Sequence, residues 1–113
     1  MALMAVAFPI APGQTEKWHA WMGELNGARR DEFVASRRAG GVRERTFLQE
    51  TPMGDLVIVT LEGEDPMASF AKMISADDDF TRWFIAKANE VHNVDLSQPM
   101  PGALPTLVVD SEG

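Results

Sequence analysis

The stretch RERTFLQETPMGDLVIVTLEG, residues 43–63, decides the fold of this chain. Its two halves, 43–51 and 55–63, are rich in the β-branched, aromatic and leucine side chains that are typical of strands. The tripeptide Pro52-Met53-Gly54 between them is a tight-turn signal. We therefore predict that the two halves pair as an antiparallel hairpin.

The second strand of this hairpin is apolar on both faces. Because side chains alternate along a strand, Leu56 and Ile58 lie on one face and Val57 on the other. The runs 3–10 (LMAVAFPI) and 106–109 (TLVV) are apolar in the same two-sided way. A sheet covered by helices on one side normally keeps a polar second face, so we expect a second copy to cover the apolar one. The predicted partner is a homodimer, packed sheet against sheet.

The remaining segments predict helices and one further strand. Residues between Thr15, a candidate N-cap, and Gly40 read as one long helix, weakened at Gly23 and Gly27. After it come the hairpin, a helical region over 65–92 that breaks near residue 76, a proline-rich loop over 93–105, and the strand over 106–109. This order predicts a single ferredoxin-like domain over residues 1–113. It is an α+β fold of βαββαβ order, with a four-stranded antiparallel sheet and its helices on one face.

Composition restricts the classes of partner. A net charge of −7 over 113 residues argues against a nucleic acid or an anionic membrane, both of which need clustered cations, and we expect neither as a partner. With no cysteine and two histidines, we expect no metal site and no cofactor. The three residues 77–79 are adjacent aspartates, which predicts a helix cap rather than a calcium loop. Residues 1–10 lack a basic leading region, and we expect a cytoplasmic protein.

The first helix carries a candidate ligand-binding group. On the wheel of a continuous helix, Arg29 and Glu32 fall in the apolar sector that Trp18 and its neighbours define. In one interpretation they line a cavity between helix and sheet, where the guanidinium binds a carboxylate or enolate. In the other they form an i to i+3 ion pair with a structural role, which is the commoner arrangement.

The helix over residues 80–92 carries further candidates. Trp83 and Phe84 belong to its apolar stripe, where they form either the walls of a pocket or part of the core. Lys87 interrupts that stripe. A desolvated ammonium group there would be a base or a Schiff-base nucleophile. More often such a lysine lays its stem along the aromatic rings and keeps its charge in water.

Two histidines are candidate proton acceptors. His92 lies in the last turn of its helix, where the helix dipole also favours a cation. His19 lies beside Trp18 at the edge of the apolar sector of the first helix. For each of them a local structural role is the alternative to catalysis.

Several of these features resemble the dimeric α+β barrel superfamily. They are the element order, the two-sided strands, the Pro12-Gly13 entry to the first helix, and the second helical region ending in NEVHNVDL, residues 89–96. The superfamily includes antibiotic-biosynthesis monooxygenase-like and stress-responsive barrel proteins, haem-degrading enzymes and small isomerases. The resemblance implies a dimer closed through its sheets. Haem-degrading members share an Asn on the first strand with a Trp and a His on the second helical region. Trp83 and His92 are loosely similar to the last two, but the first strand has no Asn.

Together these features favour the binding, or the cofactor-independent conversion, of a small, planar, mostly apolar molecule between helices and sheet. In this hypothesis His92 or His19 accepts a proton and Arg29 anchors an anion. Trp83 and Phe84 form the walls. The alternative is a non-enzymatic homodimer, a structural or interaction protein whose own tryptophans fill the core.

Overall fold

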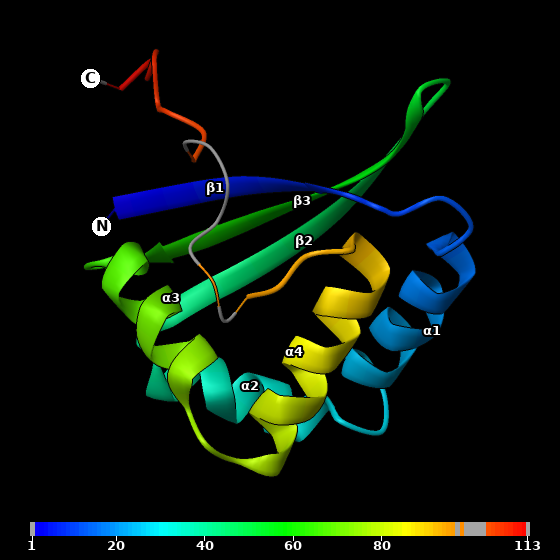
Figure 1. The fold of residues 1–113 in the computed structure, drawn as a ribbon. Coiled ribbons are helices and arrows are strands. Elements are labelled where there is room, and N and C mark those ends of the chain that lie inside the picture. The colour runs from blue at the N-terminus through cyan, green and yellow to red at the C-terminus, as the bar shows by residue number, and fades with distance from the viewer. Residues whose placement is uncertain (1, 97, 99–103, 113) are drawn as a thin grey trace.

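A computed structural model describes residues 2–96, 98 and 104–112. It is an α+β fold in which helices cover one side of a three-stranded antiparallel sheet of order β1-β3-β2 (Figure 1). The elements, in chain order, are β1 (Ala2–Pro9), α1 (Thr15–Leu25), α2 (Arg30–Ala39), β2 (Val42–Thr51), β3 (Gly54–Gly63), α3 (Pro66–Ser75) and α4 (Asp79–His92).

The predicted hairpin is confirmed. β2 and β3 pair antiparallel from Val42 opposite Gly63 to Thr51 opposite Gly54, so the connection is as tight as the turn signal indicates. Gly54 has a φ of 126°, a conformation that a residue with a Cβ rarely adopts. β1 then pairs antiparallel with the other edge of β3, which makes β3 the central strand.

The break in the second helical region is also confirmed. α3 begins with Pro66 in its first turn and ends at Ser75, and α4 begins after Asp78, whose side chain accepts a hydrogen bond from the Thr81 backbone N–H. α4 ends at His92 because Asn93 adopts the left-handed conformation, with a φ of 52°. These caps set where α4 begins and ends.

The prediction of one long helix over the first helical region is wrong. The chain forms turns at residues 26–29, and α2 starts again at Arg30. The backbone N–H of Gly27 bonds to the Glu24 carbonyl, and so does the N–H of Arg29, so the regular i to i−4 pattern is lost. Asn26 and Gly27 are poor helix formers, and this explains why the break falls there. Thr15 is the first helical residue rather than the N-cap, and its hydroxyl donates to the Asp55 carboxylate at 2.7 Å.

The predicted fourth strand is absent from the described chain. Residues 106–109 have no regular secondary structure and pair with no strand, and their apolar side chains are exposed: Leu107 at 71%, Val108 at 85% and Val109 at 81%. Figure 1 shows this segment above β1. Within the proline-rich loop predicted over 93–105, positions 97 and 99–103 lie outside the described residues. A strand needs a neighbour for its backbone groups, and apolar composition alone does not supply one.

The two faces of the sheet have different environments, as the alternation predicts. Val57, Val59 and Leu61 of β3 face the helices, and Val57 and Leu61 are only 2% exposed. Leu56 and Ile58 point the other way. Ile58 lies between Ala7 of β1 and Phe47 of β2, and Phe47 is 52% exposed. In the described chain no helix covers this second face, which we call the outer face (Figure 1).

Candidate functional site

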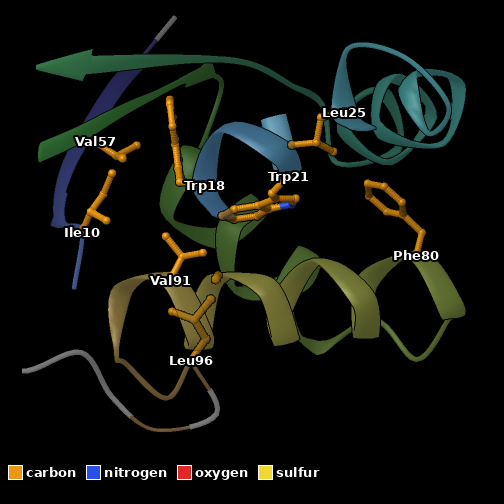
Figure 2. Close-up of a cluster of buried hydrophobic side chains, with 9 residues drawn as sticks. Ile10, Trp18, Trp21, Leu25, Val57, Phe80, Val91 and Leu96 are labelled. Atoms are coloured by element: carbon orange, nitrogen blue, oxygen red, sulfur yellow. The ribbon is translucent and has the colours of Figure 1, made fainter. Parts of the chain in front are cut away.

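A cavity of about 80 Å³ lies between the helices and the inner face of the sheet. Most of its wall is apolar and comes from β1, β3, α1 and α4, with Phe8, Trp18, Trp21, Val57, Phe84 and Ala88 among the lining residues. Figure 2 shows Trp18 and Trp21 between the strands and α4, with Val91 projecting from α4 toward them. An engineered apolar cavity of about 150 Å³ binds benzene, so this space is smaller but of the same order.

The cavity also has five polar lining residues. They are Arg37, Glu44, Thr46, Thr81 and His92. His92 comes from the last turn of α4, whereas Arg37 and Glu44 come from α2 and β2. A mostly apolar pocket with a few polar groups is the usual construction of a small-molecule site.

His92 is held as a neutral imidazole. Its Nδ1 lies 2.9 Å from the Pro9 carbonyl oxygen, which can only accept, so Nδ1 carries the proton and donates. Burial lowers the pKa of His92 below its usual value, although the hydrogen bond to Pro9 opposes this shift. The ring packs against Phe8, with centroids 5.1 Å apart, and against Trp21 at 6.3 Å. Nε2 therefore keeps its lone pair, and no described residue donates to it.

Arg37 and Glu44 form an ion pair in the cavity wall. Arg37 Nε donates to Glu44 Oε1 at 2.7 Å, and the side chains are only 11% and 7% exposed. Arg37 Nη1 donates to the Ser36 hydroxyl at 2.8 Å. The guanidinium lies over the rings of Phe33 and Phe84, 4.9 Å and 4.6 Å from their centroids. The cavity thus has one charged but internally neutralised end.

Two buried indole N–H groups lack partners. Nε1 of Trp18 and Nε1 of Trp21 are buried and have no hydrogen-bond acceptor among the described residues. Tryptophan N–H groups usually find a partner when buried, and an unsatisfied one costs about 1–3 kcal/mol. Both side chains line the cavity, so an acceptor oxygen that entered it and displaced a ring slightly would reduce this cost.

The structure brings together only some of the residues that the sequence singles out. Trp18, Phe84 and His92 line the cavity. Arg29 and Glu32 do not: Arg29 Nε donates to Glu32 Oε1 at 2.8 Å and its Nη2 to Asp79 Oδ2 at 2.8 Å. These bonds raise the pKa of the Arg29 guanidinium.

The other candidates also lie away from the cavity. Arg29 lies over the ring of Trp83, 4.5 Å from its centroid, and Trp83 packs against the edge of the core. Lys87 is half-buried and is not among the lining residues. His19 is exposed, with its ring edge-to-face against Trp18 at 5.1 Å. These positions leave His92 as the one histidine at the cavity.

Sequence reasoning missed Arg37 and Glu44. A continuous helical wheel places Arg29 inside, but the break at 26–29 resets the helix phase, and the inward residues of α2 become Phe33 and Arg37, four positions apart. Glu44 shares its face of β2 with Thr46 and lies opposite Leu61, which is buried. An acidic residue on the inward side of a strand was the available signal.

No family model matches the chain, and no curated protein matches its sequence. Within the described residues, no cluster of three or more His, Cys, Asp or Glu side chains has the arrangement that a metal ion needs. None of the helices in that part of the chain combines the length and the apolar character that crossing a bilayer requires.

Proposed function

We propose that this protein binds a small, planar, mostly apolar molecule in the cavity between α1, α4 and the sheet. The observation that carries the proposal is the cavity itself, about 80 Å³ of space lined mostly by aromatic and aliphatic side chains. Core atoms normally pack without such voids, and an unfilled apolar space costs stability. Met4, Met22 and Met73 are flexible parts of the wall, which suits adjustment to a ligand larger than one ring.

Within this proposal His92 is the proton acceptor. Its Nε2 takes a proton from a hydroxyl or an acidic C–H of the ligand, which becomes a phenolate or enolate while the imidazole becomes an imidazolium. Return of that proton to another carbon of an enolate completes an isomerisation without oxidant, metal or cofactor. The apolar surroundings that lower the pKa of His92 keep it neutral and ready to accept a proton at pH 7.

The binding step can be tested with the tryptophans of the chain. In a ¹⁵N–¹H spectrum, titration with acetophenone, indole or coumarin should shift the indole signals of Trp18 and Trp21 and leave that of Trp83, outside the cavity, in place. Ala88→Leu fills the cavity and should abolish the shifts. Ala86→Leu makes the same change on the exposed side of α4 and should preserve them. The absence of shifts in the unmodified protein, for all three probes, would refute the proposal.

We further propose that the functional unit is a homodimer of the dimeric α+β barrel type, closed through the outer faces of two sheets. The apolar outer face supports this proposal, with Phe47 at 52% and Leu3 at 58% exposure. β1 is an edge strand, and the segment 106–109 is apolar and unpaired. In the dimer, this segment would add as the fourth strand beside β1.

Sedimentation at micromolar concentration tests the dimer. The unmodified chain should sediment as a dimer, and Phe47→Glu on the outer face should give a monomer. Met53→Glu is the matched control, because Met53 is 98% exposed in the hairpin turn and should not affect association. A monomeric unmodified chain would refute the dimer.

The exposed apolar face also favours a second candidate function, a non-enzymatic interaction protein. In that case the cavity is a packing defect and the outer face is the functional surface. Filling the cavity with Ala88→Leu would then raise stability and leave association unchanged. Specific binding of a probe by the unmodified protein would count against this second function.

A further inference from the structure

Among the described residues, the buried Arg37–Glu44 pair supplies the charged side chains of the cavity wall, and the proposed binding function does not by itself explain it. Arg37 is 9% exposed, and its Nε donates a hydrogen bond to the Glu44 carboxylate. A buried pair is weak support for stability, because its desolvation often cancels its Coulomb attraction, and apolar residues of similar volume serve as well. A charged pair in the wall of a mostly apolar cavity therefore points to a role in recognising the ligand.

The hydrogen bonds of Arg37 leave several N–H groups of its guanidinium for a ligand. Nε donates to Glu44 and Nη1 donates to Ser36, while Nη2 has no acceptor among the described residues. A guanidinium carries five N–H groups, so three remain, one on Nη1 and two on Nη2. Each of them can donate to an acceptor oxygen of a ligand, so the selection between an uncharged oxygen and a carboxylate depends on charge.

The charge of this end of the cavity also disfavours an anion. Glu44 neutralises Arg37 at 2.7 Å, so a ligand carboxylate would meet a like charge in a poorly hydrated space. The net charge of −7 on the whole chain lowers the local concentration of anions further. An uncharged oxygen, as in a ketone, ester or amide, meets neither penalty and still accepts a hydrogen bond from Arg37.

The second polar end of the cavity lies at His92. Phe84, over which Arg37 lies, precedes His92 by eight residues on α4, or about 12 Å along the helix axis. The wall between them includes Trp21 and Ala88. A proton donor on the ligand suits His92, whose Nε2 accepts, and an acceptor oxygen suits Arg37.

We infer that the Arg37–Glu44 pair is the specificity element of this cavity: it selects an uncharged ligand with an acceptor oxygen and rejects a carboxylate of the same shape. This inference rests on the proposed binding function and names the chemical class of its ligand. Glu44 is the discriminating group, because it supplies the negative charge beside Arg37.

Three probes of one shape test the inference at pH 7.5: acetophenone, methyl benzoate and benzoate. Binding is followed through the Trp18 and Trp21 indole signals. Acetophenone and methyl benzoate should bind at least about tenfold more tightly than benzoate, a difference of about 1.4 kcal/mol. The ester is the decisive comparison, because it differs from benzoate mainly in its charge.

A variant then assigns the selectivity to Glu44. Glu44→Gln removes the negative charge but keeps an acceptor for Arg37. The affinity for benzoate should rise at least about tenfold, which abolishes the preference for the uncharged probes. Glu90→Gln is the matched control: Glu90 pairs with Lys17 at 3.8 Å on the exposed side of α4 and should not change the preference. A melting curve confirms that both variants fold.

The possible outcomes distinguish a failure of this inference from a failure of the proposed binding function on which it rests. Equal affinity of the unmodified protein for benzoate and its methyl ester would overturn the selectivity while leaving the binding function standing. An unchanged preference in folded Glu44→Gln would overturn the role of Glu44. If Glu44→Gln fails to fold, the comparison of ester and carboxylate in the unmodified protein still decides the selectivity. The absence of binding by all three probes would refute the function, and the inference with it.

Discussion

Removing one member of the buried Arg37–Glu44 pair should cost much more stability than removing both. Arg37 is 9% exposed in the unmodified protein, and in Glu44→Leu its guanidinium keeps the Ser36 hydroxyl as its one remaining hydrogen-bond partner among the described residues. Breaking a buried pair in this way costs about 3–5 kcal/mol. Stacking on Phe33 and Phe84 persists, so we expect the lower end, about 3 kcal/mol.

The assay is a double-mutant cycle by thermal and urea unfolding. In a chain of this size about 3 kcal/mol corresponds to a fall in Tm of about 12 °C. Arg37→Met/Glu44→Leu replaces the pair by apolar side chains and should return to within about 1 kcal/mol of the unmodified protein. Glu90→Leu removes the partner of the exposed Lys17 and should cost less than about 1 kcal/mol. If the double variant is as unstable as Glu44→Leu, or Glu44→Leu is no worse than Glu90→Leu, the reasoning is refuted.

Three further predictions concern single side chains. Burial lowers the pKa of His92 in the folded protein below about 6.5, the usual value for histidine. Just below pH 6.5 the unfolded chain therefore binds more protons than the folded one. The unfolding free energy should therefore be highest above that pH and fall as the pH drops below about 6.5. His92→Gln should flatten this part of the urea-melt profile, and His19→Gln, on an exposed site, should not. Lys87→Met should change Tm little and leave probe titrations unchanged, because Lys87 does not line the cavity. A loss of probe binding would instead show that Lys87 takes part in the site. Arg29→Met should leave the unfolding free energy in urea nearly unchanged, since its partner Asp79 is 85% exposed; a loss as large as that of Glu44→Leu would contradict this.

Local signals account for the parts of the fold that the sequence predicts. The hairpin follows from a turn tripeptide between two β-rich runs, and the α3–α4 break from Pro66 and the cap at Asp78. Each of these depends on neighbours within a few residues. The alternation along β3 likewise follows from strand geometry, whatever covers the sheet.

The parts that sequence reasoning missed depend on phase or on distant neighbours. The turn at residues 26–29 rotates α2 relative to α1, so a wheel that places Arg29 inside cannot find Arg37. Segment 106–109 has the composition of a strand, but pairing requires a free edge within reach. The cavity could be anticipated only as a choice between a pocket and a filled core, because its volume depends on how Trp18, Trp21 and Phe84 pack.

A crystal structure of the protein purified without added ligand, and then soaked with acetophenone, tests the central claim most directly. The account predicts an open cavity between Trp21, Phe84 and His92 that holds electron density for the probe. Its oxygen should lie within hydrogen-bond distance of Arg37 Nη2. A space closed by these side chains in both crystals, with the probe absent or on the surface, would contradict the claim that this cavity is a binding site.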